Sequence, residues 1–441
     1  MFASRSLRGL CAFVVNKFAY MKKKILIALV VIILILISIL YIKFLIATSH
    51  MKELEKDLEQ RITEWENKEY KRPPLFGPAI AGNAAEFYQQ AESQMTELIK
   101  DSEVWIQWGE YVDSFKPLST TGISYYEKAK PIIELVKQNN KMESYKSPLN
   151  IRDGFGCKIP DMVSTRHIAK AMVIQGRELE KNNKYLEALQ LYCEIIRFGD
   201  SYFHYGALIP AMISIGVSEK GYEEIRRVLL TNKLSEQNIN ELISYLKILF
   251  NPEPSSQLNY ETESLSMASI LKSGIAKKES FPPSAWLKTI LGVQAWDDIP
   301  LIYKEIGEIT TLPYYKAKDD TEKLQERIKG FWNPITRLSC SITAQNLSRW
   351  HQHRATRRGL YILCALEIYK ARHQKYPEKL SDLAPDVIKE VPLDPFSDQP
   401  FIYKVDQDQK IMLYSVSENL KDDGGDEKNF NDIVIAPLKK W

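Results

Sequence analysis

The sequence lacks the short motifs by which many hydrolases, metalloproteases and nucleotide-binding proteins are recognised. It has no G-x-S-x-G, no H-E-x-x-H and no phosphate-binding P-loop. Residues 269–272 match S-x-x-K, but the K-S-G at 272–274 overlaps that motif and cannot form the separate strand that such enzymes need. Residues 154–156 lack the third glycine of a dinucleotide-binding turn. We therefore assign no catalytic and no cofactor-binding residue.

Cysteine is scarce and widely spaced. There are five, with no C-x-x-C pair, which excludes a zinc ribbon and a thioredoxin-type site. Cys193 and Cys364 stand among apolar residues with helical spacing, and we expect both to be buried thiols. The sequence does not assign a disulfide among the four cysteines from Cys157 onward.

Acidic residues are missing from the first 24 positions, which carry six basic side chains. With Lys43 these give +7, so the remainder of the chain has a net charge of 3 − 7 = −4, from the overall +3. Nucleic-acid binding needs clustered basic residues that neutralise phosphates. The mildly acidic remainder therefore argues against a nucleic-acid partner.

A long apolar run follows the basic tail. Residues 25–42 are eighteen residues without a charge, and 43–47 extend them to a length that can cross a bilayer. The basic flank at 22–24 predicts a cytoplasmic tail at 1–24 and an extracytoplasmic remainder. The membrane that we expect is the inner membrane of a bacterium. The alternative is a signal peptide cleaved near 47–49, although its apolar core would be unusually long. Residues 1–20 fit a loose tail or an upstream mis-start, and a mitochondrial presequence is the other alternative.

The region beyond the anchor is predicted to be mainly α-helical. We expect a stalk helix and linker at 48–83, a helical domain at 84–333, and a long helix from 334 to 373. Small residues and tyrosines in 176–192 have the spacing of one degenerate tetratricopeptide-like helix pair. Ser235 is a predicted N-cap. Strand patterns occur only after Pro392, at 400–405, 410–416 and 433–435.

Basic and aromatic residues cluster at two predicted helix surfaces. His351 and His353 are two apart, so on a helix they point in different directions, and we expect surface or groove histidines rather than a metal pair. The basic run 349–358 is interpreted as a solvated face; contact with lipid headgroups or an acidic partner is the alternative. Trp105, Trp108 and Tyr111 are interpreted as core packing, with a ligand groove as the alternative.

The last quarter contains the most specific pattern. Tyr376-Pro377 precedes two leucines at 380 and 383, and then come V-P-L-D-P-F at 391–396, Q-P-F-I-Y at 399–403 and Y-S-V-S at 414–417. Pro392 and Pro395 bracket Asp394, which favours a turn. This region resembles the C-terminal part of the major pseudopilins of type II secretion. The resemblance implies a small α+β module at 334–441, with a short antiparallel sheet packed on a helix by Phe396, Phe401 and Tyr403.

In that family, the loop after the Tyr-x-Ser strand binds calcium through carboxylates and backbone oxygens. The resemblance therefore implies a Ca²⁺ site in this chain, since oxygen-rich loops with tight glycine turns suit this ion. The residues that match in type or position are Asn419, Asp422, Asp423, Asp426 and Asp432. Asn419 stands where aspartate is usual and the spacing is about one residue longer; an acidic surface loop is the alternative.

Two departures limit what the resemblance implies. The leader and the Phe-Thr-Leu-x-Glu motif of pilin-like subunits do not precede the apolar run, and a helical body of about 300 residues separates anchor from module. The whole layout resembles single-pass envelope proteins of planctomycete-type bacteria to which no activity is assigned.

The function expected from the sequence is binding. We expect a membrane-anchored extracytoplasmic scaffold, in contact with lipid through residues 25–47 and with an envelope protein, beside a secretion or pilus-like system. Helix arrays offer grooves for such partners. The alternatives are a hydrolase-like envelope enzyme with a site of dispersed residues, and a calcium-stabilised structural module.

Overall fold

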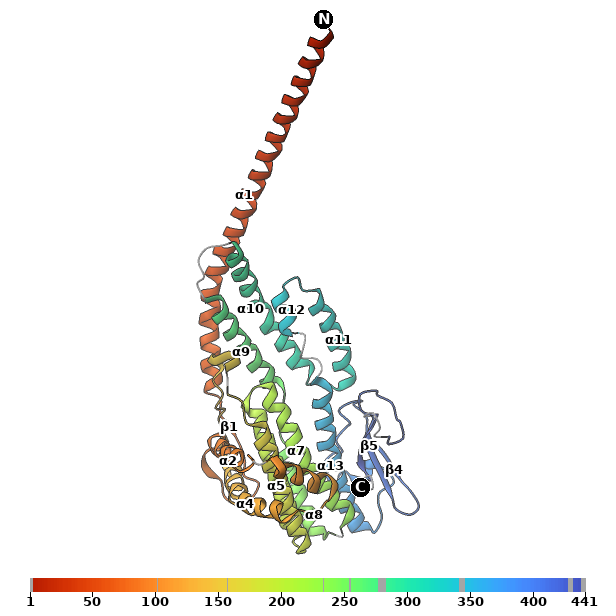
Figure 1. Ribbon diagram of the computed structural model, residues 1–441. Coiled ribbons are helices and arrows are strands. Elements are labelled where there is room, and N and C mark those ends of the chain that lie inside the picture. Colours follow the sequence, from red (N-terminus) through yellow and green to blue (C-terminus); the bar gives the residue numbers. More distant parts are fainter. Residues whose placement is uncertain are drawn as a thin grey trace.

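The computed structural model describes residues 3–100, 102–156, 158–232, 234–253, 255–276, 283–340, 346–426 and 431–437. A single helix, α1, leaves one end of an elongated helical body, and a small sheet covers one flank of the body near the other end (Figure 1). The mainly helical class predicted from the sequence is confirmed.

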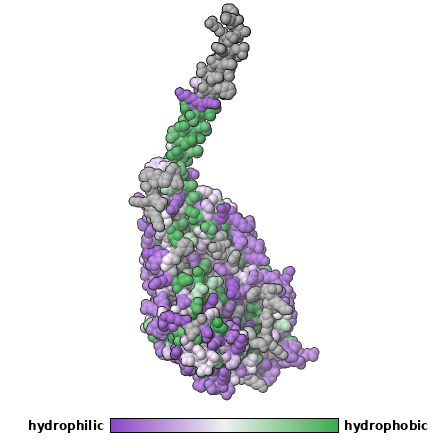
Figure 2. Space-filling view, in the orientation of Figure 1, coloured by the Kyte–Doolittle hydropathy of each residue, from purple (hydrophilic) through white to green (hydrophobic). Residues whose placement is uncertain are grey.

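Helix α1 runs from Ala3 to Glu66 without a break. Within the described residues it is the one helix long and apolar enough to cross a membrane, and its apolar surface stands clear of the body (Figure 2). Its last part packs into the body, where Leu58, Ile62 and Trp65 are buried. The Trp65 indole N–H donates to Thr262 Oγ1 at 2.9 Å. The segment expected as a stalk is thus partly a core helix.

Within the described residues, the lower body is built from seven helices in chain order. Their bounds are α2 Ala84–Leu98, α3 Ser102–Ser114, α4 Thr120–Asn140, α5 Met162–Lys181, α6 Tyr185–Ser201, α7 Leu208–Thr231 and α8 Glu236–Phe250. Side-chain caps fix several starts, because a Ser, Asn or Asp oxygen there accepts an otherwise unpaired backbone N–H. Ser235 accepts from Asn238 N, so the predicted cap of α8 is confirmed.

Glycines allow α5, α6 and α7 to approach closely. A Cβ on Gly176 would lie 2.3 Å from the Tyr192 ring, and one on Gly221 would lie 2.7 Å from the Tyr192 carbonyl oxygen. Gly199 is equally tight against Ser218. The predicted close helix pair at 176–192 is present as α5 and α6, while its tetratricopeptide character stays a prediction.

A small sheet in the lower body was not predicted. Strands β1 Tyr70–Lys71, β2 Ile80–Asn83 and β3 Met142–Tyr145 pair in the order β1-β3-β2. The expectation of strands only after Pro392 was therefore wrong. These strands are two to four residues long, which is too short for alternation to be visible in the sequence. The 3₁₀ turns η1 Ile151–Gly156 and η2 Tyr202–Tyr205 complete this part.

The upper body lies beside α1. It consists of α9 Gln257–Ala276, α10 Pro283–Ile309, α11 Tyr314–Gly330 and α12 Pro334–Cys340, followed by the central helix α13 Leu347–His373. The predicted helix at 334–373 is described as α12 and α13, and residues 341–345 between them lie outside the described part.

The C-terminal sheet is antiparallel, as predicted, with the order β4-β5-β6. Its strands are β4 Ile402–Val405, β5 Ile411–Ser415 and β6 Ile433–Ala436, after the 3₁₀ turn η4 Leu380–Leu383. Asp394 is buried and organises the predicted turn. Its Oδ1 accepts from Phe396 N and Ser415 Oγ, both at 2.9 Å, and its Oδ2 accepts from Val416 N.

The sheet packs on α13, as the sequence predicted. Phe396 and Phe401 are buried and Tyr403 is half-buried. A Cβ on Gly359 of α13 would lie 2.5 Å from Ile435 Cγ1, so this glycine lets β6 approach the helix. One hydrophobic cluster extends from Leu58 to Ala436. The predicted division into a helical domain at 84–333 and a C-terminal module at 334–441 stays a prediction.

Candidate functional site

The basic run on α13 is largely buried, so its interpretation as a solvated face was wrong. His351 and His353 are both buried. The ring nitrogens of His351 lie 2.9 Å from the carbonyl oxygens of Leu347 and Leu312, and burial lowers its pKa to about 4. Burial also lowers the pKa of His353 well below its usual value. Neither is the surface or groove histidine that the sequence predicted.

Arg357 is the centre of this buried region, with 0% of its surface exposed. Its Nη1 donates to the Asp200 carboxylate at 2.9 and 3.1 Å and to Tyr222 Oη at 3.1 Å. Its Nη2 donates to Leu249 O at 2.6 Å, and its guanidinium lies over the Phe250 ring. One side chain of α13 therefore ties together α6, α7 and α8.

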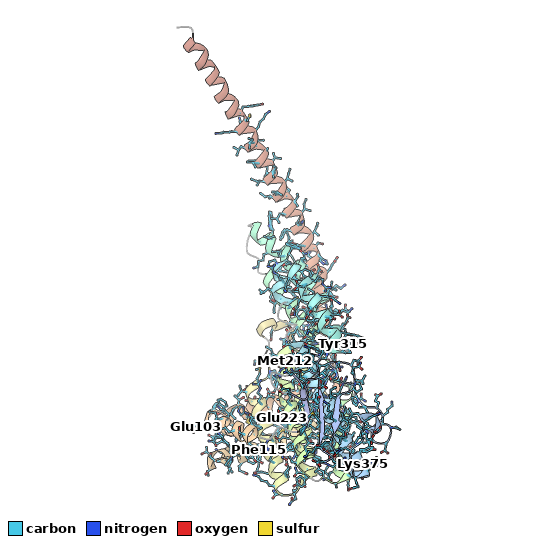
Figure 3. All side chains as sticks on the ribbon, turned by 90° about the vertical axis from the view of Figure 1, so that its right-hand side faces the viewer. Glu103, Phe115, Met212, Glu223, Tyr315 and Lys375 are labelled. Carbon is cyan, nitrogen blue, oxygen red and sulfur yellow. The ribbon has the colours of Figure 1, made fainter. Side chains whose placement is uncertain are left out.

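Beside this cluster, a groove of about 370 Å³ opens between α7, α13 and β6. We call it the α7–α13–β6 groove. It is lined by Glu219, Tyr222, Glu223, Arg226, Arg349, Gln352, Thr356, Leu360 and residues 432–435. Glu223 marks its place in Figure 3, far from the end of α1 that leaves the body.

The groove has mixed charge. Burial raises the pKa of Glu219, and the nearby Arg349 opposes that rise. Asp432 is 2% exposed, and its Oδ2 accepts from Gly425 N at 2.8 Å and Asp426 N at 3.1 Å. Burial raises the pKa of Asp432 as well. Both carboxyls therefore border the groove with a reduced tendency to ionise.

Several polar groups of the groove already have structural partners. Arg226 Nη1 donates to Val434 O at 2.7 Å, which joins α7 to β6. Glu223 accepts from Lys220 at 2.9 Å. The Thr356 hydroxyl donates to Gln352 O, and Tyr222 Oη accepts from Arg357. Among the described lining residues, no hydroxyl is hydrogen-bonded to a carboxylate or histidine that could serve as its base.

The predicted calcium residues lie in one loop, but their side chains serve local hydrogen bonds. Asp422 Oδ1 accepts from Tyr414 Oη at 2.5 Å and from Gly424 N at 2.9 Å. Asn419 Nδ2 donates to Asp423 Oδ2, and Asp426 is held through its backbone by Asp432. No group of three His, Cys, Asp or Glu within the described ranges is arranged to hold a metal ion. Residues 427–430 of this loop lie outside those ranges.

The other candidate residues behave as packing groups. Trp108 is buried and donates to Gly122 O at 3.2 Å, which confirms core packing, whereas Trp105 is 43% exposed. Cys193 and Cys364 are buried free thiols, as predicted. No pattern in the sequence predicts the groove, because its walls come from three separate segments at 219–226, 349–360 and 432–435.

Comparison of the chain with protein-family models, with curated proteins and with solved structures found no match in any of the three.

Proposed function

We propose that this is a single-pass, membrane-anchored binding protein whose α7–α13–β6 groove holds an extended segment of a partner protein. The observation that carries the proposal is the composition of that groove. The groove is bordered by an edge strand, by acidic carboxyl groups and by basic guanidinium groups. An edge strand suits a polypeptide main chain, and groups of both charges suit mixed side chains. The basic residues at 22–24 support an orientation with the body outside the cytoplasm.

The edge of the C-terminal sheet supports an extended ligand. Strand β6 pairs with β5 on one side, and Ile433, Val434 and Ile435 line the groove. An extended peptide can align with an edge strand and use its main-chain hydrogen bonds, while pockets select alternate side chains. Arg226 already occupies the Val434 carbonyl, so we expect pairing along only part of β6.

Site-specific photocrosslinking in membranes tests this proposal. A benzophenone amino acid replaces Gln352 in the groove, and the matched control carries it at Glu134 on the outer face of α4. We expect a specific crosslink to an envelope protein from position 352 alone. A synthetic peptide with the crosslinked sequence should compete, and Glu219→Lys should weaken the crosslink. Equal crosslinking from both positions, or no competition by the peptide, would overturn the proposal.

An envelope enzyme is the second candidate, because Glu219 and Asp432 both border the groove and both have raised pKa values. Such a pair could act as general acid and base. Hydrolysis of an ester, peptide or glycoside substrate that is lost in both Glu219→Gln and Asp432→Asn would favour this candidate. Retained hydrolysis in both variants would exclude these carboxyls.

The finer assignments are supported by sequence resemblance only. The motifs at 376–403 support a pseudopilin-like module, placement in a bacterial inner membrane beside a secretion or pilus-like system, and calcium in the loop 419–432. A calcium-dependent rise in melting temperature that Asp422→Ala with Asp423→Ala removes would support the metal. An equal response of both proteins would count against it.

A further inference from the structure

An aromatic cluster joins the body to the anchor helix. Trp286, in the first turns of α10, has its ring centroid 5.1 Å from that of Tyr41 and 5.9 Å from that of Phe44. Both partners lie in the last two turns of the apolar segment 25–47. A helix of that length spans about 35 Å, slightly more than a hydrocarbon core of roughly 30 Å. Trp286 therefore lies at the depth where the outer end of that core meets the headgroups.

A second part of the body reaches nearly the same depth. The turn between α11 and α12 is fixed to α10 by Asn333, which is fully buried. Asn333 Nδ2 donates to Leu291 O at 2.8 Å. Leu291 follows Trp286 by five residues, or about 7.5 Å along the helix axis. Figure 1 shows this turn directed towards the same end of the body as the start of α10.

Both places expose side chains that are suited to a membrane interface. Leu287 is 46% exposed, and Trp332, at the α11–α12 turn, is 63% exposed. Lys288, which follows Leu287, and Arg337, five residues after Trp332, are exposed as well. Single exposed apolar residues are ordinary on protein surfaces. Tryptophan with leucine and basic residues, at the level where an apolar helix ends, is the composition of an interfacial belt that contacts lipid phosphates.

We infer that these two places, residues 286–288 and 332–338, insert into the headgroup region of the membrane that α1 crosses. We call them the membrane-contact tips. The occupant is the lipid bilayer, because the anchor places a bilayer at this depth and the tips continue its aromatic end. The inference rests on the proposed membrane span of α1. Its consequence is that the body stands in one orientation, held by three contacts, with the α7–α13–β6 groove directed away from the membrane.

A contact between α1 and α10 supports a rigid arrangement. His50 Nε2 lies 2.9 Å from Asp297 Oδ1, about three turns further along α10 than Trp286. The hydrogen bond to Asp297 raises the pKa of His50, so the bond is strongest when the imidazole is protonated. The anchor and α10 are thus joined at two levels.

Spin-label depth measurements on the full chain in liposomes with anionic lipid test the inference. The background carries Cys11→Ser and Cys157→Ser, and Cys193, Cys340 and Cys364 are buried. Single labels are placed at Leu287→Cys and Trp332→Cys, with Ile33→Cys in the anchor and Ile106→Cys on α3 as controls. Ile106 is 50% exposed, and α3 lies in the lower body, where Glu103 and Phe115 are labelled in Figure 3. The measurement compares collision with oxygen and with a water-soluble nickel complex.

We expect labels at 33, 287 and 332 to favour oxygen over nickel, in that order of depth, and the label at 106 to favour nickel. Suppose that the label at 33 favours oxygen, but the labels at 287 and 332 collide with nickel as readily as the label at 106. That result would overturn the membrane contact of the tips, while the membrane span of α1 would still hold. A label at 33 that favours nickel would overturn the anchor as well. Spectral broadening at 287 and 332 that disappears on dilution with unlabelled protein, without oxygen preference, would assign the tips to a second copy and overturn the lipid contact.

Discussion

Two glutamates are buried in the lower body within a polar network. Glu92 accepts from the hydroxyl of Tyr202 and from Asp161 N, and Glu194 accepts from Asn140 Nδ2. The network continues through Tyr88, whose hydroxyl donates to Asn140 Oδ1 at 2.5 Å. Burial raises the pKa of each glutamate to about 7. Each is therefore protonated in the folded chain at pH values where an unfolded glutamate is ionised.

Because of these two glutamates, we expect the free energy of unfolding to fall as the pH rises. A glutamate with a folded pKa of about 7 and an unfolded value of about 4.3 binds more protons in the folded state, so the free energy of unfolding decreases between those two pH values. The slope is about 1.4 kcal/mol per pH unit for each group. Glu92→Gln should therefore gain about 3 kcal/mol relative to the parent chain between pH 5 and pH 8. Urea unfolding of the full chain at both pH values measures this.

The control for that measurement is Glu134→Gln on the outer face of α4, which removes a half-exposed charge. A pH dependence that is the same in Glu92→Gln and in the parent chain would show that Glu92 ionises normally in the folded state.

Among the elements, α6 and α7 of the lower body pack closely backbone to backbone. A Cβ on Gly199 would lie 2.4 Å from Ser218 Oγ, 2.8 Å from Ser218 N and 3.0 Å from Ser214 O. Two of these three atoms belong to the backbone of α7, so a side chain at 199 must push the helices apart. Gly216, in the same helix pair, has no heavy atom within 4 Å of its Cβ position.

The two glycines therefore predict opposite results for the same substitution. Gly199→Ala should lower the free energy of unfolding by about 2 kcal/mol or more, because overpacking shifts the backbone. Gly216→Ala should raise it by up to about 1 kcal/mol, because alanine is the better helix former. Chemical denaturation followed by circular dichroism compares them. A loss of equal size in both variants would mean that helix separation does not depend on residue 199.

At the scale of the whole molecule, α13 connects the C-terminal sheet to the lower body through ion pairs of different burial. The pair of Arg357 with Asp200 has side-chain exposures of 0% and 13%, whereas that of Arg372 with Glu236 has 34% and 42%. Both pairs link α13 to helices of the lower body. Because the two pairs differ in burial, substitutions in them compare the loss of a buried cation with the loss of an exposed one.

Arg357→Met should lower the free energy of unfolding by about 3–5 kcal/mol, since it leaves the largely buried Asp200 carboxylate without its cation. Arg372→Met should cost at most about 1 kcal/mol, because water screens exposed pairs. Urea unfolding of the full chain measures both. Adding Asp200→Asn to Arg357→Met should restore part of the loss; a further loss of full size would show that the two residues act independently.

The sequence determined those features that depend on neighbours along the chain. The apolar run at 25–47, the helical character of 84–333, the cap at Ser235 and the turn at Asp394 are local patterns, and each is present in the structure. The strands predicted at 400–405 and 410–416 are likewise present as β4 and β5.

Tertiary structure alone decided which surfaces of those elements are covered. The charged run 349–358 reads as a solvated face, yet Arg357 is buried because Asp200, Tyr222 and Leu249, all more than 100 residues away, supply its partners. The sheet of β1, β2 and β3 and the α7–α13–β6 groove are likewise formed by segments that are distant along the chain. Local spacing specifies which face of a helix is apolar, but the burial of a charge depends on partners that only the folded chain brings within hydrogen-bond distance.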